Sequence, residues 1–169
     1  MAELTALFRP QSVAVVGASK QPGKIGNAVM KNILASGYRG AVYPINPKES
    51  EILGVTCHPS VSAVPANIDM AVLSVPAAQV LAVARECGEK KVKALTIITA
   101  GFKEIGKEGL DLEKKLLLLC SQYDMRMLGP NCVGLMDTHT PINASFAATF
   151  LSKGEIAFLS QSGAILLAI

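Results

Sequence analysis

The stretch "VVGASKQPGKIGNAVMKNI", from Val15 to Ile33, passes from an apolar run into a helical pattern through three glycines. Gly17, Gly23 and Gly26 permit a tight turn and a close approach of the backbone to another molecule. A loop of this kind, between a buried strand and the N-terminus of a helix, is suited to holding a phosphate group. The stretch therefore predicts an α/β fold whose first loop binds a phosphate.

The rest of the chain repeats this alternation of apolar runs and helical patterns. Apolar runs rich in Val, Ile and Leu lie at 12–16, 41–45, 69–75, 94–99, 126–128 and 155–159, and helical patterns cover 25–35, 77–90 and 109–123. In the helical pattern at 109–123, the spacing places the leucines on one face, with Leu110, Glu113, Leu116, Leu117 and Cys120 in the pattern. Continuous apolar runs are typical of parallel strands covered on both sides. We expect a Rossmann-like, doubly wound parallel sheet with helices on both faces.

Composition and charge exclude several classes of function. The 169 residues, half of them hydrophobic, can bury one sizeable core and fit one domain plus the start of another. The net charge of +3 comes from scattered basic residues, which gives no indication of nucleic acid binding. We expect a cytoplasmic protein without a membrane span, because no apolar run is long enough and the N-terminus does not resemble a leader. The widely spaced cysteines predict reduced, mostly buried thiols rather than disulfides or a metal site: Cys57, Cys87, Cys120 and Cys132.

Each expected strand ends in small or turn-forming residues. The exits read "GASKQPGKIG", "PINPKE", "SVPA", "TAGF" and "LGPNCVG" in chain order. In open parallel sheets, ligands bind at the carboxyl ends of the strands, where these exits come together. The sequence therefore predicts one elongated ligand shared by several exits.

The nature of the ligand follows from the first two exits. A nicotinamide or flavin dinucleotide usually requires G-x-G-x-x-G and an acid after the second strand. Here Gly17 is followed by Ala18 and Ser19, and the second strand is followed by Asn46, Pro47 and Lys48. A lysine at that place offers its charge to a phosphate on the ribose. Coenzyme A and NADP both fit this pattern.

The exits together resemble a known family. The series "VVGASKQPGKIG", "YPINPK", "LSVPA", "TAGF", "LGPNCVG" and "FLSQSGA" is similar to the coenzyme A binding domain of the nucleotide-diphosphate-forming acyl-CoA synthetases. That superfamily includes the alpha subunit of succinyl-CoA synthetase and the ADP-forming acetyl-CoA synthetases. The resemblance covers nearly the whole chain, and "GPNCVG" combined with "SQSG" is its most specific part.

The resemblance implies a set of coenzyme A contacts. The first loop would wrap the nucleotide end, Lys48 would contact the phosphates, and Asn131 would lie near the thiol. The whole set is Gly17, Ser19, Lys20, Gln21, Pro22, Gly23, Lys48, Val75, Pro76, Ile98, Thr99, Ala100 and Asn131. Ala100 stands where the succinate enzyme has a Glu, which leaves that contact to the backbone.

The resemblance places catalysis outside this chain. Family members phosphorylate a histidine in a second domain, and the phosphoryl group moves between the nucleotide and an acyl phosphate that the coenzyme A thiol attacks. His58 and His139 do not match that histidine and are interpreted as surface loop residues, so this chain alone is expected to be inactive. Ser162 and Gly163 begin the last helix, where the family receives the phosphate; the residues alone favour a serine cap.

Residues 1–150 are expected to form the coenzyme A binding domain, and 151–169 the first strand and helix of a truncated, flavodoxin-like second domain. The resemblance further implies an ATP-grasp domain or beta subunit, a small carboxylic acid or acyl phosphate as substrate, and ATP or ADP with Mg²⁺ bound outside this chain. Two alternatives are a regulatory coenzyme A binding module of a bacterial protein lysine acetyltransferase and, on fold analogy alone, an NADP-linked oxidoreductase.

Overall fold

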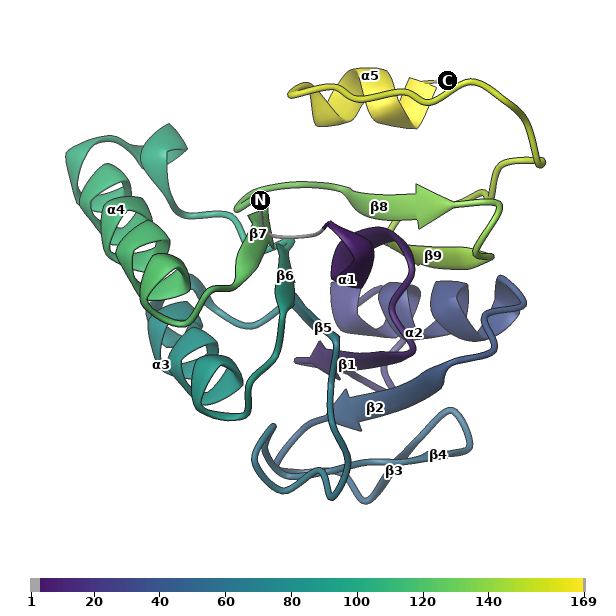
Figure 1. The fold of residues 1–169 in the computed structure, drawn as a ribbon, viewed down its shortest axis with the longest axis horizontal. Helices are drawn as coiled ribbons and strands as arrows, with labels where there is room; N and C mark the ends of the chain where they lie inside the picture. Colours follow the sequence, from purple (N-terminus) through teal and green to yellow (C-terminus); the bar gives the residue numbers. More distant parts are fainter. Residues whose placement is uncertain (1–3, 169) are drawn as a thin grey trace.

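The computed structural model describes residues 4–168, and a parallel sheet of five strands forms its centre (Figure 1). The strand order is β2-β1-β5-β6-β7, and every neighbouring pair is parallel. The order reverses between β1 and β5, which is the switch point where ligands of such sheets bind. The strands are β1 (Ser12–Val16), β2 (Ala41–Ile45), β5 (Met70–Leu73), β6 (Ala94–Ile97) and β7 (Arg126–Leu128).

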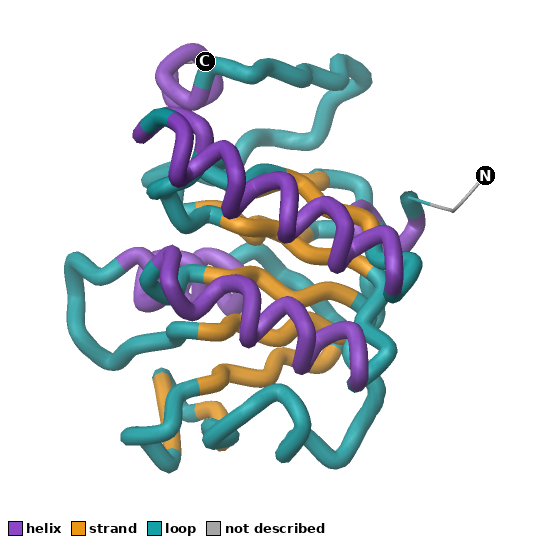
Figure 2. Tube along the Cα trace, turned by 90° about the vertical axis from the view of Figure 1, so that its left-hand side faces the viewer, coloured by secondary structure: helices purple, strands orange, loops and turns teal. Residues whose placement is uncertain are grey.

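Helices cover both faces of this sheet, which confirms the predicted fold class. Alternate residues of β1 belong to different cores: Val13 and Val15 pack with one helix, while Ala14 and Val16 pack with the other two. In Figure 2, α3 and α4 cross in front of the strands. The helices are α2 (Ile25–Ala35) on one face and α3 (Ala77–Glu89) and α4 (Lys107–Gln122) on the other; a short α1 (Thr5–Phe8) and a 3₁₀ turn η1 (Lys103–Ile105) complete the set up to residue 122.

The buried face of α4 differs from the prediction. Leu116 and Cys120 are buried as expected, but Leu110 and Leu117 are 39% and 50% exposed. The buried positions are Gly109, Leu116, Leu119 and Cys120. Adjacent residues of a helix are about 100° apart, so Leu116 and Leu117 cannot both point into one core. The helix therefore buries the stripe through Leu116 and leaves Leu110 and Leu117 on the neighbouring face.

A hairpin that the sequence analysis did not predict packs on the outer side of α2 (Figure 1). Its strands are β8 (Gly134–Asp137) and β9 (Ile142–Ser145), which pair antiparallel. The Asn32 side-chain amide of α2 donates to the carbonyl oxygens of Ser145 and Ala147, both at 2.8 Å. Helix α2 thus lies between the sheet and the hairpin. A second, smaller hairpin joins β3 (Glu51–Ile52) and β4 (Val55–Thr56).

The edge strand β2 contains a proline, Pro44, opposite Val15 of β1. In a parallel strand the N–H and C=O of one residue point to the same side, so the missing N–H of Pro44 costs the β1–β2 ladder nothing. The Pro44 carbonyl instead accepts a hydrogen bond from His58 N at 2.9 Å, and Asn46 N donates to His58 O at 2.9 Å. The segment around His58 therefore covers this edge of the sheet.

The predicted strand at 155–159 is not formed. Ile156 and Leu159 are 93% and 92% exposed, and the backbone of this segment is not paired with any described strand. A strand requires a neighbour for its backbone hydrogen bonds, and residues 4–168 supply none here. The expected helix follows as α5 (Gly163–Ala168). The division at residue 150 stays a prediction, and residues 1–3 and 169 lie outside the described part.

Within residues 4–168, no helix has the length and apolarity that crossing a membrane requires. The four cysteines are free thiols, of which Cys57, Cys87 and Cys120 are buried and Cys132 is half-buried, as the sequence predicted. Burial raises the pKa of Cys87 to about 12 and that of Cys120 to about 11.

Candidate functional site

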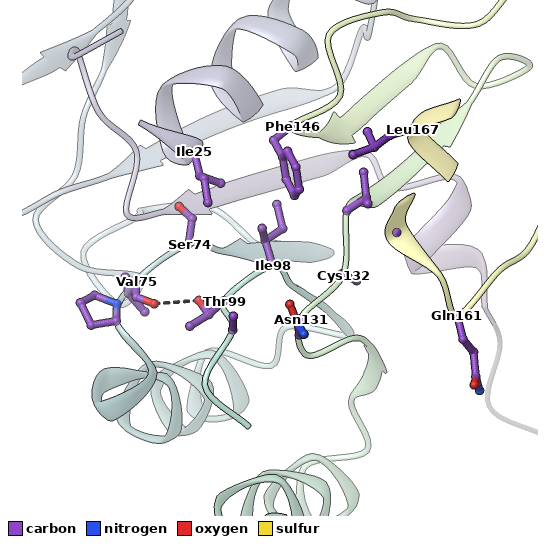
Figure 3. A pocket seen from close by; sticks show the side chains of 14 residues that line it. Ile25, Ser74, Val75, Ile98, Thr99, Asn131, Cys132, Phe146, Gln161 and Leu167 are labelled. Carbon is purple, nitrogen blue, oxygen red and sulfur yellow. Dashed lines mark hydrogen bonds between the residues drawn. The ribbon is translucent and has the colours of Figure 1, made fainter. Parts of the chain in front are cut away.

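A cavity of about 650 Å³ lies at the carboxyl ends of β5, β6 and β7 (Figure 3). Its walls come from three strand exits, the start of α2, the residue after β9, and α5. Most of the lining is apolar, with a few hydroxyl, amide and thiol groups. The lining residues are Ile25, Ser74, Val75, Pro76, Ile98, Thr99, Ala100, Asn131, Cys132, Val133, Phe146, Gln161, Gly163 and Leu167.

The predicted site residues divide into two groups. The structure brings the later exits together around the cavity, through Val75, Pro76, Ile98, Thr99, Ala100, Asn131 and Gly163. The residues of the first two exits, and the serine before α5, do not line it: Gly17, Ser19, Lys20, Gln21, Pro22, Gly23, Lys48 and Ser162. An elongated ligand in the cavity would have to leave it to reach the first loop.

Direct hydrogen bonds join the third, fourth and fifth exits. The Thr99 hydroxyl donates to the carbonyl oxygen of Val75 at 2.7 Å, as the dashed line in Figure 3 shows. Asn131 N donates to the carbonyl oxygen of Thr99 at 3.0 Å. These two bonds tie the three exits to one another. The part of the cavity wall that the exits form is therefore held together without a ligand.

The fifth exit, "LGPNCVG", crosses the end of β6 at close range. A Cβ on Gly129, whose φ is 92°, would collide with the carbonyl oxygen of Ile97, so only glycine fits this position. The Cys132 thiol donates to the same carbonyl at 3.3 Å. Burial raises the pKa of Cys132, which keeps the thiol protonated. Cys132 thus serves as a wall of the cavity and a hydrogen-bond donor to β6.

The first loop is held by side-chain amides. The buried Asn27 of α2 donates to the carbonyl oxygen of Ser19 at 2.9 Å, and Asn46 donates to that of Ala18 at 2.8 Å. Gly17, at the end of β1, has a φ of 88°, and a Cβ there would lie 2.8 Å from the carbonyl oxygen of Ser74. The loop after β1 is therefore packed against both the second and the third exits.

Two predicted coenzyme A contacts, Lys20 and Lys48, lie on the rim outside the cavity lining. Lys20 Nζ lies 2.6 Å from Glu49 Oε2, and this hydrogen-bonded pair raises the pKa of Lys20. Lys48 is exposed, and its backbone N donates to Asn46 Oδ1 at 2.9 Å. The second exit thus presents one cation, Lys48, beside an anion, Glu49, that already holds the cation of the first loop.

The serine before α5 acts as a helix cap. Ile165 N donates to the Ser162 hydroxyl at 3.4 Å, and Ser162 N donates to the Ser160 hydroxyl at 3.0 Å. Gly163 lines the cavity instead, and a Cβ on it would lie 3.1 Å from Cγ2 of Val133. The role in phosphate binding stays a prediction for both residues.

The two histidines lie in loops outside the cavity lining. His58 follows β4, and its ring meets Tyr43 edge-on with the centroids 5.9 Å apart. His139 lies in the turn between β8 and β9, where Nε2 is 3.0 Å from the carbonyl oxygen of Gly154.

Sequence reasoning missed part of the lining. Ser74, Cys132 and Val133 lie inside quoted exits and could have been found by taking each exit as a whole. Phe146 follows the unpredicted hairpin and carried no signal, although its ring faces the cavity beside Ile25 in Figure 3. Gln161 and Leu167 come from the C-terminal segment, and the Gln161 side chain points away from the other labelled residues.

Comparison with known proteins bears directly on this cavity. Residues 11–138 match the model of the CoA binding domain family, and they include the first five strand exits. The chain belongs to this family. It is 48% identical over 163 residues, 96% of its length, to acetate–CoA ligase [ADP-forming] I of Archaeoglobus fulgidus. It is also 48% identical, over an alignment of 170 positions that covers 98% of this chain, to the alpha subunit of acetate–CoA ligase [ADP-forming] I of Pyrococcus furiosus.

A solved structure has the same fold over nearly the whole chain. Acetyl-coenzyme A synthetase 1 of Ca. Korarchaeum cryptofilum, in complex with phosphate and ADP, superposes with a TM-score of 0.95 at 46% identity and covers 99% of this chain. The match takes up 36% of that protein, and 24% and 37% of the Archaeoglobus and Pyrococcus relatives. The chain therefore spans between about a quarter and a little over a third of the length of these three proteins.

Proposed function

We propose that this chain is the coenzyme A binding portion of an ADP-forming acyl-CoA synthetase, with acetate as the favoured acid. The observation that carries the proposal is the cavity at the carboxyl ends of β5, β6 and β7, which the third, fourth and fifth of the exits predicted to contact coenzyme A line together. The family match and the acetate ligases at 48% identity support the same conclusion.

The proposed ligand runs from the first loop into the cavity. Its nucleotide end lies at the exits of β1 and β2, where Lys48 offers a charge to the ribose phosphate. The pantetheine arm follows Ile98, Thr99 and Ala100, whose mixed apolar and backbone surface suits a chain of methylene and amide groups. The thiol ends near Asn131. In this arrangement the chain binds and orients coenzyme A, while Ser162 and Gly163, at the start of α5, stay the predicted phosphate site for the phosphorylated histidine.

The remaining steps of the reaction belong to parts beyond this chain. In the proposed protein, ATP or ADP with Mg²⁺ binds to an ATP-grasp domain or beta subunit, and a histidine outside residues 1–169 carries the phosphoryl group. An acyl phosphate made from the carboxylic acid is then attacked by the coenzyme A thiol, which releases phosphate. Incubation of this chain with labelled ATP or acetyl phosphate is expected to leave His58 and His139 unlabelled; acid-labile label on either would contradict the assignment.

Calorimetry with coenzyme A and with NADH tests the binding proposal. We expect a coenzyme A signal and no appreciable NADH binding, because the second exit carries Lys48 rather than a ribose-binding acid. Lys48→Ala removes a charge-assisted contact and should weaken coenzyme A binding about tenfold or more. Lys115→Ala, an exposed lysine on α4, is the matched control. Tight NADH binding without a coenzyme A signal, or an equal effect of both substitutions, would contradict the proposal.

A further inference from the structure

An ion pair connects the two exits that carry the proposed nucleotide contacts. Lys20 Nζ, on the loop after β1, lies 2.6 Å from Glu49 Oε2, on the loop after β2. The Glu49 side chain is 28% exposed and that of Lys20 is 54% exposed. Glu49 N donates to the carbonyl oxygen of Asn46, and the Asn46 amide donates to Ala18, so both ends of the pair are anchored to bonded loops.

Glu49 is the main anion acting on Lys20. Among the groups that influence the Lys20 ammonium, the hydrogen bond and the charge of Glu49 come first, and Glu51 acts only over a longer range. An exposed ion pair of this kind contributes little net stability and exchanges easily. A phosphate, with up to two charges and three acceptor oxygens, is a stronger partner for an ammonium than a carboxylate. The Lys20 ammonium can therefore exchange Glu49 for a phosphate that binds at this rim.

The position of the pair indicates which phosphate is involved. In doubly wound folds, the loop after the second strand lies against the ribose of the bound nucleotide. Glu49 and Lys48 are neighbours on that loop, with Lys20 held across from them. A phosphate on the ribose would thus meet Lys48 and Lys20 together with the carboxylate of Glu49.

We propose that Glu49 is a specificity-determining residue: it competes with the ribose phosphate of the ligand for Lys20 and so weakens the preference for the phosphorylated coenzyme. This inference rests on the proposed function, in which coenzyme A binds at these exits. Because the carboxylate both occupies Lys20 and repels an incoming anion, its removal strengthens binding, and it does so only for a ligand with a phosphate at this place.

The test measures the affinities of coenzyme A and dephospho-coenzyme A, which lacks the ribose phosphate, by calorimetry at fixed salt. Glu49→Gln keeps the shape of the side chain and removes its charge. We expect it to tighten coenzyme A binding roughly two- to fivefold and to leave dephospho-coenzyme A within about 1.5-fold. Glu51→Gln, which removes an exposed carboxylate without breaking an ion pair, is the control and should change neither affinity by more than about 1.5-fold.

A double-mutant cycle with Lys20→Ala shows whether the effect passes through Lys20. In the Lys20→Ala background, Glu49→Gln should lose most of its gain. The inference is overturned if Glu49→Gln leaves coenzyme A binding unchanged or weaker, if both ligands gain equally, or if the gain persists without Lys20. Those results leave coenzyme A binding by the original chain intact. Absence of binding of either ligand to the original chain would instead overturn the proposed function, and this inference with it.

Discussion

Replacing Gly17 and, separately, Gly23 by alanine should separate the conformational cost of a positive φ from the cost of a steric collision. Gly17 directly follows β1 with a φ of 88°, a conformation that costs an L-residue about 1–2 kcal/mol. Its added Cβ would also lie 2.8 Å from the carbonyl oxygen and 2.9 Å from the carbonyl carbon of Ser74. Gly23, in the same loop, has a φ of 84° but no atom within 4 Å of an added Cβ. Gly23→Ala therefore carries the conformational cost without the collision.

The collision sets the expected difference between the two variants. Forcing extra volume against a packed backbone typically costs about 1–3 kcal/mol. We expect Gly23→Ala to lower the free energy of unfolding by about 1–2 kcal/mol, and Gly17→Ala by about 2–5 kcal/mol. Because Ser74 lines the cavity, Gly17→Ala should also weaken coenzyme A binding, whereas Gly23→Ala should affect it less.

Urea unfolding of the chain with each substitution measures the free energies, and calorimetry measures the affinities. Equal destabilisation by the two substitutions would show that the Gly17–Ser74 approach is not tight. If Gly23→Ala weakened coenzyme A binding more than Gly17→Ala did, the contact between Gly17 and Ser74 would not be what supports the cavity wall.

Three further predictions concern the cavity and its supports. At pH 7 a thiol reagent should label Cys132 before the buried cysteines, but more slowly than a thiol in free solution because burial raises the pKa of Cys132. Coenzyme A should slow the labelling of Cys132 further, and an unchanged labelling rate would place the ligand elsewhere. Asn27→Ala removes the bond to Ser19 from a buried site and should lower the free energy of unfolding by about 1–3 kcal/mol in urea, and a smaller loss would mean that water replaces the amide. In a chain extended through the predicted second domain, Ser162→Ala and Gly163→Val should impair histidine phosphorylation while coenzyme A affinity stays nearly unchanged, with Gly163→Val more damaging; normal phosphorylation in both would leave only the cap of α5.

The parallel sheet was predictable because its three central strands, β1, β5 and β6, are buried along their whole length and consist almost entirely of apolar residues without alternation. The hairpin β8–β9 escaped prediction for the opposite reason: its strands interrupt their apolar residues with Asp137, Asn143 and Ser145. Asn143 and Ser145 are buried because their side chains bond each other and because α2 covers the hairpin. Such burial depends on tertiary contacts that a local pattern does not contain.

The cavity shows a similar limit. The exits of small residues predicted a shared ligand site, since the carboxyl ends of parallel strands must share one edge, and the family resemblance then named Val75, Thr99 and Asn131 within them. Which residues line the cavity, and which lie on its rim, depends on how far each loop reaches beyond the sheet. The Lys20–Glu49 pair could not be foreseen either, because it joins two loops through long side chains whose directions the backbone does not fix.

Pro44 and the short β7 also determine how copies of this chain can meet. The outward side of β2 is occupied by the His58 segment, and at the other margin β7 has only three residues, beginning with the exposed Arg126. A long row of free peptide groups would recruit a strand from another molecule, and neither margin of the sheet offers one. Concentrated solutions of the chain should therefore resist amyloid-like stacking through this sheet. Where copies of the chain meet at this sheet, we expect contacts between side-chain surfaces, which can evolve independently of the strands that position the cavity.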